Sequence, residues 1–204
     1  MSAGVAVRIR RGPAAALLAA TLTACAGDGP EWNATELPRD FPDLALGVTG
    51  ESGEPLVRES LDGRVVLLAF GYTACPDVCP DTLGRLRAAL GALPEPTAAR
   101  VRVVFVSVDP RRDDPARLAR YTAAFGERFI GATAPPPRLR ELINRFGGSF
   151  SRGEDDGDGL YTVDHPAGVY AFDAGGDARL LIGRGQPVEA IAADIRRLVD
   201  AGAA

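Results

Sequence analysis

The spacing of apolar residues divides the chain into alternating strands and helices. Residues 64–70 and 101–108 are two mainly apolar runs, and such runs are typical of strands covered on both faces. Between them, after residues 80–81, spacings of three and four predict an amphipathic helix with its apolar face at Leu83, Leu86, Leu90 and Leu93. A second helix is predicted to begin at residues 114–115, with Asp as the N-cap and Pro in the first position. This order predicts a βαβα unit with a parallel pair of strands.

The remaining elements predict a thioredoxin-like fold. The pattern indicates a strand, a short helix, two strands joined by a hairpin turn, and a closing amphipathic helix, over residues 44–48, 139–146, 168–172, 179–182 and 188–199 respectively. Cys75 and Cys79 fall where the first central strand ends and its helix begins. We therefore expect an α/β protein of thioredoxin-like fold, in which helices flank a central mixed sheet that carries an N-terminal strand extension.

The first residues have the layout of an export signal. Three arginines form a basic start, residues 13–22 are a short apolar stretch, and small residues lead up to Cys25. This ending resembles the bacterial lipobox, in which cleavage before the cysteine leaves that residue as the lipid-carrying N-terminus. The alternative is a plain secretory signal with an unremarkable cysteine. We expect a lipoprotein signal peptide over residues 1–24, a flexible lipid-anchored tether over 25–40, and a domain over 41–204 on the extracytoplasmic side of the cell membrane.

Length and charge exclude several classes of protein. At 204 residues the chain is long enough for one domain with a tail, and no run approaches the ~20 apolar residues of a membrane-spanning helix. The net charge is −4, and removal of residues 1–24, which hold three arginines and no acid, makes it −7. An acidic domain is a poor candidate for nucleic-acid binding, because phosphate contacts need a basic face.

Cys75 and Cys79 are either a redox pair or two ligands of a metal. If Cys25 is the anchor, they are the remaining cysteines of an exported domain, where a lone pair of thiols tends to oxidise. Their place at a helix start stabilises a thiolate, which is both the nucleophile and the metal-binding form. Three residues separate them, whereas thioredoxin-like redox motifs use two, and this spacing brings both sulfurs toward one side of a helical turn, as a chelate requires.

A third ligand is available in His165, the single histidine of the chain. It lies just before the first hairpin strand, at a position that faces the cysteine turn in a thioredoxin-like fold. Together with the two cysteines it forms a Cys2His set of metal ligands. Asp109 lies at the end of a central strand, where it either supports the metal loop or caps the turn before the next helix.

Three sequence blocks resemble the signatures of the Sco/SenC family. They are "FGYTACPDVCPDT" at residues 70–82, "VSVDPRRDDP" at 106–115 and "YTVDHPAGVY" at 161–170, and the resemblance extends over residues 41–199. It implies a membrane-tethered copper-binding protein that assists assembly of the binuclear copper site of cytochrome c oxidase subunit II.

Carried onto this chain, the resemblance implies that one copper per monomer is bound by Cys75, Cys79 and His165. Asp164 would be the acid beside the ligand histidine, with an effect on its orientation or on partner recognition. Two thiolates and an imidazole suit Cu(I) and can hold Cu(II) with an added ligand. Zinc accepts the same ligands, but no motif for a zinc hydrolase is present. The chain departs from the family pattern at Pro166, where a small polar residue is usual, and no methionine follows Met1, so no thioether can join the site.

Two alternatives to copper delivery involve thiol chemistry. A thiol-disulfide oxidoreductase that reduces cysteines of exported proteins would use Cys75 and Cys79 as catalytic residues. A peroxidase would need a threonine and a supporting arginine near the cysteine. Thr73 precedes Cys75 by two residues, but the sequence places no arginine beside it.

Pro166 raises a question of backbone geometry. Thioredoxin-like enzymes commonly carry a cis-proline in the position that faces the active-site cysteines, and Pro166 occupies that position by its order along the chain. Only about 5–6% of X–Pro bonds in folded proteins are cis, so the general expectation is trans. Our hypothesis is that a cis His165–Pro166 bond directs the imidazole at Cys75 and Cys79.

Overall fold

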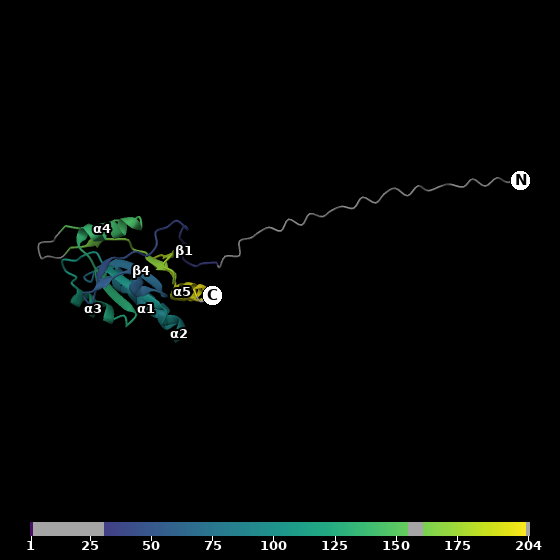
Figure 1. The fold of residues 1–204 in the computed structure, drawn as a ribbon, viewed down its shortest axis with the longest axis horizontal. Coiled ribbons are helices and arrows are strands. Elements are labelled where there is room, and N and C mark those ends of the chain that lie inside the picture. The colour runs from purple at the N-terminus through teal and green to yellow at the C-terminus, as the bar shows by residue number, and fades with distance from the viewer. Residues whose placement is uncertain (2–30, 155–160, 203–204) are drawn as a thin grey trace.

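The fold is built on a mixed β-sheet whose middle strands run parallel (Figure 1). The computed structural model describes residues 1, 31–154 and 161–202, and in this part of the chain eight strands form one sheet in the order β1-β10-β9-β4-β5-β6-β2-β3. The strands are β1 (Thr35–Glu36), β2 (Val48–Gly50), β3 (Pro55–Leu56), β4 (Val65–Gly71), β5 (Val101–Ser107), β6 (Phe129–Thr133), β9 (Val169–Phe172) and β10 (Ala178–Ile182). β4, β5 and β6 pair in parallel, and the other strands of the sheet pair antiparallel.

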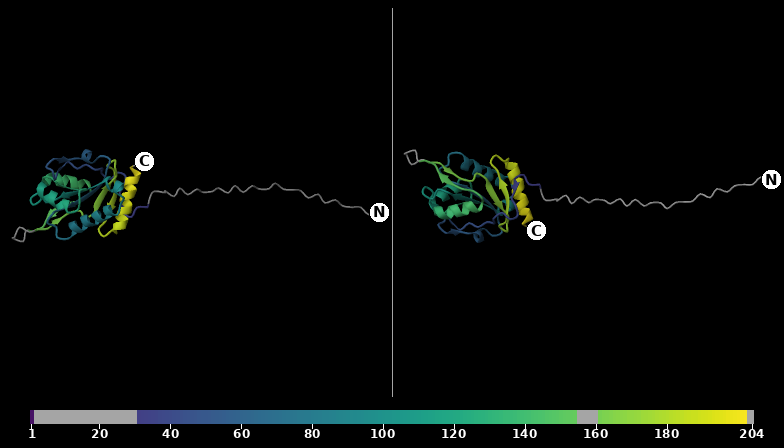
Figure 2. Two further views of the ribbon diagram at one scale, coloured as in Figure 1. Left: turned by 90° about the horizontal axis from the view of Figure 1, so that it is seen from below. Right: turned by 90° about the horizontal axis from the view of Figure 1, so that it is seen from above.

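Helices cover both faces of this sheet. They are α1 (Val78–Gly91), α2 (Glu95–Ala98), α3 (Pro115–Ala123), α4 (Pro136–Arg145) and α5 (Val188–Ala201), with a 3-10 helix over Arg58–Leu61 and a separate two-stranded pair of β7 (Ser151–Arg152) and β8 (Val163–Asp164). Figure 2 shows α5, in yellow, at the same end of the domain as the start of the described chain. None of the helices in the described ranges is both long and apolar enough to cross a membrane.

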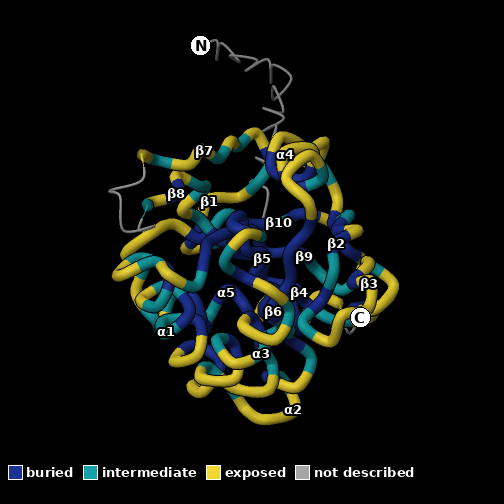
Figure 3. Tube along the Cα trace, turned by 90° about the vertical axis from the view of Figure 1, so that its left-hand side faces the viewer, coloured by how far each residue is buried: buried dark blue, intermediate teal, exposed yellow. Residues whose placement is uncertain are grey.

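The two faces of β4 contribute to two separate hydrophobic clusters. Because successive strand residues point to opposite faces, Val65, Leu67 and Ala69 pack with α1 and α5, whereas Val66, Leu68 and Phe70 pack with α4. The same alternation in β5 divides Val103 and Phe105 from Val104 and Val106. Figure 3 shows these central strands in dark blue, enclosed by exposed helices and loops. This double coverage explains why the strands read as continuous apolar runs.

The predicted fold class is confirmed, and so is the start of α3. The structure has a central mixed sheet flanked by helices, and the order strand, helix, strand, helix holds for β4, α1, β5 and α3. Asp114 is the N-cap of α3, because its Oδ1 accepts a hydrogen bond of 2.7 Å from the backbone N–H of Arg117. Pro115 takes the first helical position, as expected.

Several boundaries differ from the sequence-based expectation. Of the predicted strand over 44–48, only the last residue is in a strand, because β2 begins at Val48, although Leu44 and Leu46 are buried. α1 begins two residues earlier than predicted, and α4 begins at Pro136 because proline is pre-organised for the first turn. The short strand β6 was missed, since its five residues show no alternation and it forms by pairing with β5 on one side and β2 on the other.

The second half of the predicted tether lies on the domain. β1 pairs antiparallel with β10 through Thr35 and Glu36. Just before it, the buried carboxylate of Asp194 on α5 accepts hydrogen bonds from the backbone N–H groups of Asn33 and Ala34, at 3.0 and 2.8 Å, and from the Asn33 side chain at 2.9 Å. These bonds outweigh the Gly- and Pro-rich composition that indicated a flexible segment up to residue 40. Residues 2–24 of the predicted signal peptide, and Cys25, fall outside the described residues.

The Asp194 contact predicts a measurable effect on stability. Replacement of Asp194 by Ala leaves four donors without their acceptor, the three named above and the Gln186 side chain at 3.4 Å. The free energy of unfolding should therefore fall by about 2 kcal/mol, and the amides of Asn33 and Ala34 should exchange faster. Urea denaturation and amide hydrogen exchange measure both effects. Asp200→Ala, at an exposed position of the same helix, is the matched control. Equal stabilities of the two variants would show that the contact contributes nothing.

Candidate metal centre

The two cysteines lie on one turn between the end of β4 and the start of α1. Cys75 is half-buried in the loop, and Cys79 is 3% exposed in the first turn of the helix. Gly71, the last residue of β4, makes this approach possible. A Cβ atom at Gly71 would lie 2.7 Å from Cys79 Sγ and 2.5 Å from the ring of Phe105, so only glycine allows the sulfur to pack against the strand end.

His165 lies between β8 and β9 and faces Cys79 on α1. Its Nε2 lies 3.7 Å from Cys79 Sγ, although the two residues are 86 positions apart. Nδ1 lies 2.9 Å from the carbonyl oxygen of Pro166, and a carbonyl can only accept a hydrogen bond. The proton of the neutral ring is therefore on Nδ1, and the lone pair of Nε2 points toward the sulfur. Metal-binding histidines use this arrangement, in which a hydrogen bond at one nitrogen fixes the ligand role of the other.

The two thiols differ in acidity. Burial raises the pKa of Cys75, but the backbone N–H groups of Cys79, Asp77 and Val78 donate to its sulfur and outweigh that effect, so the net pKa is lowered. The Cys79 N–H lies 3.4 Å from Cys75 Sγ. At Cys79 burial dominates, and together with the neighbouring Cys75 it raises the pKa to about 12. Cys75 is thus the nucleophilic sulfur, and Cys79 stays protonated at neutral pH.

The structure places both other predicted ligands next to Cys79. His165 contacts the Cys79 sulfur, and the Cys75 sulfur accepts a hydrogen bond from the backbone N–H of Cys79 and interacts with its thiol. Within the described ranges no cluster of three or more His, Cys, Asp and Glu side chains is close enough to hold a metal ion. The donor types fit a soft metal, since two thiolates and an imidazole suit Cu(I).

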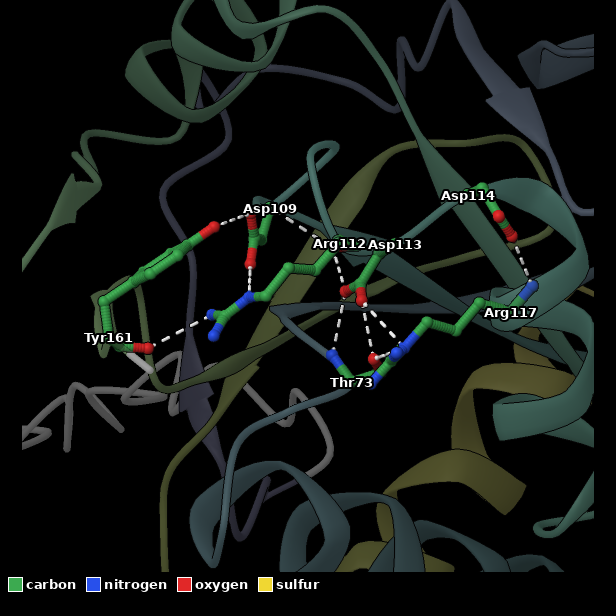
Figure 4. Close-up of polar contacts among 8 residues, drawn as sticks. Thr73, Asp109, Arg112, Asp113, Asp114, Arg117 and Tyr161 are labelled. Carbon is green, nitrogen blue, oxygen red and sulfur yellow. Dashed lines mark hydrogen bonds and ion pairs between the residues drawn. The ribbon is translucent and has the colours of Figure 1, made fainter. Parts of the chain in front are cut away.

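Asp109 supports the chain that leads to His165 and not the cysteine loop. Its Oδ1 accepts a 2.7 Å hydrogen bond from the hydroxyl of Tyr161, and its Oδ2 pairs with Arg112 (Figure 4). Asp164 is exposed on β8 and accepts a hydrogen bond from Ser151 at 3.3 Å. The His165 Nδ1 is already bound to the Pro166 carbonyl, and among the described residues no contact links Asp164 to the imidazole.

Sequence analysis missed Asp113, the carboxylate that holds the cysteine loop. Asp113 is fully buried and accepts hydrogen bonds from both the backbone N–H and the hydroxyl of Thr73, at 2.8 and 2.6 Å. Arg117 completes the group, with Nε 2.7 Å from Thr73 Oγ1 and 3.5 Å from Asp113. The sequence did show an acid directly before the helix cap Asp114. It was missed because two adjacent acids at a helix start do not reveal which one is buried.

The arginine that a peroxidase requires beside Thr73 is therefore present, contrary to the sequence-based expectation. Arg117 comes from α3 and contacts the threonine directly. The Thr73 hydroxyl proton is, however, donated to Asp113, and its oxygen accepts from Arg117. A hydroxyl whose proton is already bound to a carboxylate has none to offer a peroxide. This arrangement favours a structural role for Thr73.

The hypothesis of a cis bond before Pro166 is wrong. The described chain contains no cis peptide bond. The imidazole is aimed instead by the hydrogen bond from Nδ1 to the Pro166 carbonyl and by the ring of Tyr72, which packs edge-on at 6.0 Å between centroids. The proline ring lies over Gly148, where a Cβ atom would be 2.5 Å from Pro166 Cγ. A trans proline thus fits here because the facing residue has no side chain.

The fold and the site define a class of protein. A thioredoxin-like domain carries two thiols on the turn that leads from β4 into α1. His165, in the segment before β9, contacts the buried Cys79 sulfur. The SCO1/SenC family model matches residues 46–200, and the chain belongs to this family.

Individual relatives agree with this assignment. The chain is 32% identical over 177 residues to the mitochondrial protein SCO2 homolog of Mus musculus, covering 84% of this chain and 69% of that protein. It is 34% identical over 176 residues to a putative copper-binding protein of Stutzerimonas stutzeri, covering 84% and 85%. Among solved structures, Bradyrhizobium japonicum ScoI with copper bound has a TM-score of 0.67 at 33% identity, covering 76% of this chain and 99% of that one.

The asymmetry of the two thiols predicts their order of reaction. In the reduced full-length protein, iodoacetamide should alkylate Cys75 with a rate that rises around a midpoint below the ordinary thiol pKa of ~8.5, because the thiolate is the reacting form. Cys79 should react at least about 100-fold more slowly at pH 7, since its pKa is about 12 and it is buried. Peptide mapping by mass spectrometry separates the two sites. Equal rates, or faster reaction of Cys79, would contradict the assignment.

Proposed function

We propose that this protein is a membrane-anchored copper-binding chaperone that delivers copper to, or matures, the binuclear copper site of cytochrome c oxidase subunit II. The observation that carries the proposal is the contact between the single histidine and the buried Cys79, at 3.7 Å, in a chain of the SCO1/SenC family. The name of the Stutzerimonas stutzeri relative and the copper-bound Bradyrhizobium japonicum structure support copper as the metal.

The proposed ligands are Cys75, Cys79 and His165, with one copper ion per monomer. His165 Nε2 carries the free lone pair toward Cys79, and the Cys75 sulfur lies beside Cys79 on the same turn. Both sulfurs bind as thiolates, so binding releases the proton that Cys79 holds with a pKa of about 12. Copper affinity therefore rises with pH. An intramolecular disulfide removes both thiolates and prevents binding.

The alternative function is reduction of cysteines in exported proteins. A half-buried Cys75 with a lowered pKa beside a buried Cys79 with a raised pKa is the arrangement of an attacking and a resolving thiol. The two functions differ in their need for His165, because dithiol exchange requires only the two sulfurs. Delivery of copper to a dithiol site also requires that dithiol to be reduced, so the two activities are compatible in one protein.

The copper proposal predicts a strong effect at His165. His165→Ala should lower copper affinity by at least about 100-fold, because loss of a ligand exceeds the ~10–100-fold cost of losing a group that only orients one. Dithiol exchange with glutathione should stay close to the wild-type rate. The measurement is anaerobic titration of the reduced full-length protein with Cu(I), in competition with a strong Cu(I) chelator, and with Cu(II) by absorption spectroscopy.

Asp77→Asn is the control for this experiment, since it changes a charge in the same loop but keeps the backbone N–H. Unchanged affinity and spectrum in His165→Ala would remove His165 from the ligand set. A wild-type protein that exchanges disulfides but does not bind copper would favour the oxidoreductase.

The anchoring proposal concerns Cys25. We infer that it is lipidated and that the domain faces outward from the membrane on a tether. Several acyl chains are needed for stable retention, and bacterial lipoproteins carry more than one. Cys25→Ser should release the protein or leave residues 1–24 uncleaved, whereas Cys75→Ser should remain in the membrane fraction. Cell fractionation and N-terminal mass spectrometry test this, and wild-type protein found in the soluble fraction with a free N-terminus would contradict it.

A further inference from the structure

We propose that the loop between β5 and α3, residues 108–114, holds both halves of the metal site in register, with Asp113 fixing the cysteine loop and Asp109 with Arg112 fixing the segment that carries His165. Neither aspartate contacts a proposed ligand, so both are positioning residues. The inference rests on the proposed function only where copper is measured. Its other measurements concern the copper-free protein.

The first arm of the loop is Asp113, which binds the chain that enters the cysteine turn. The Asp113 carboxylate is fully buried, and it accepts from Thr73 N–H, Thr73 Oγ1 and Ser107 Oγ at 2.8, 2.6 and 2.5 Å. A buried carboxylate needs several such donors, because it has lost its water. Thr73 lies two residues before Cys75, whose own N–H donates to the carbonyl of Tyr72 at 3.2 Å. Asp113 thus fixes the backbone where it leaves β4 and enters the cysteine turn.

The second arm is Asp109 with Arg112, which bind the chain ahead of His165. Asp109 is 4% exposed and accepts the Tyr161 hydroxyl at 2.7 Å. Arg112 pairs with Asp109, places its guanidinium 3.6 Å from the centre of the Tyr161 ring, and donates to the Tyr161 carbonyl at 3.1 Å. Both the side chain and the backbone of Tyr161 are therefore held, four residues before His165. Arg112 also lies 5.4 Å from the ring of Tyr72, the ring that packs edge-on against the imidazole.

The two arms meet in a single turn. The Ser107 hydroxyl accepts from the backbone N–H of Asp109 at 3.1 Å and donates to Asp113. The Asp109 carbonyl accepts from the backbone N–H of Asp113 at 3.0 Å. Figure 4 shows Asp109 and Asp113 on the same loop, with their side chains extending to Tyr161 on one side and Thr73 on the other. A shift of this turn would move both ligand segments.

Separate variants test the two arms. Thr73→Val and Asp113→Asn loosen the first arm, because valine has no hydroxyl and an amide cannot accept at every position that a carboxylate does. Thr73→Ser keeps the hydroxyl and should behave as wild type. Tyr161→Phe removes only the bond to Asp109 and loosens the second arm. Asp114→Asn, at the exposed helix cap beside Asp113, is the matched control because asparagine also caps helices well.

Two measurements on the copper-free full-length protein separate the arms. A cysteine loop that is loose in the dithiol loses more conformational freedom when the disulfide closes. Thr73→Val and Asp113→Asn should therefore lower the equilibrium constant for oxidation by glutathione about 10-fold, which is about 30 mV. Tyr161→Phe should leave this constant within about twofold of wild type. It should instead shift the NMR signals of the imidazole, which are unambiguous because the chain has one histidine. Thr73→Val should leave those signals in place.

Copper titration completes the test. Each arm variant should bind copper about 10-fold more weakly, as expected when a group that orients a ligand is lost, while Thr73→Ser and Asp114→Asn bind as wild type. If Thr73→Val and Asp113→Asn lower only the melting temperature, and the glutathione constant and copper affinity stay at wild-type values, the proposal is overturned. The same holds if Tyr161→Phe leaves both the imidazole signals and the copper affinity unchanged. A wild-type protein that binds no copper refutes the proposed function, and the copper-free measurements still decide the role of the loop.

Discussion

The parallel pairing of β4 and β5 is the constraint on which the site depends. Gly71 at the end of β4 lies in register with Ser107 at the end of β5, so both strands end at the same edge of the sheet. Parallel strands of this kind bring the loops at their carboxyl ends together. The cysteine turn follows one strand and the loop with Asp109 and Asp113 follows the other, which allows a buried carboxylate on the second loop to bind the first. The hydrophobic core fixes the strands, and this register then determines which polar groups meet.

Two buried carboxylates fix segments that apolar packing alone leaves free. Asp113 binds the turn before Cys75, and Asp194 binds the chain ahead of β1. Each accepts at least two backbone or side-chain N–H or O–H groups, and its negative charge is partly offset by an arginine at the surface, Arg117 at 3.5 Å and Arg197 at 3.9 Å. Burial of a carboxylate is costly without such hydrogen-bond partners, so these sites specify one conformation of the loop or strand that they bind.

The two cysteines of the pair have different electrostatic surroundings. The half-buried Cys75 sulfur receives backbone N–H groups, which lower its pKa, whereas Cys79 is enclosed by apolar side chains that raise its pKa. One sulfur is thus accessible to a partner and the other faces His165 inside the domain. The proposed metal transfer and the alternative thiol exchange would both use this asymmetry, because both begin with attack by, or on, the accessible sulfur.

The sequence by itself determined the features that depend on neighbouring residues. Apolar runs located β4 and β5, Asp114 and Pro115 marked the start of α3, and the order of strand and helix placed Cys75 and Cys79 where β4 ends and α1 begins. Other features were decided by the tertiary structure alone, because the partners are far apart along the chain: Thr73 and Asp113 are separated by 40 residues, and Ala34 and Asp194 by 160. Composition indicated a tether up to residue 40, and adjacent acids concealed which one was buried. Local sequence records the propensity of a segment, whereas the burial of a carboxylate and the donors that meet it exist only once the strands have paired.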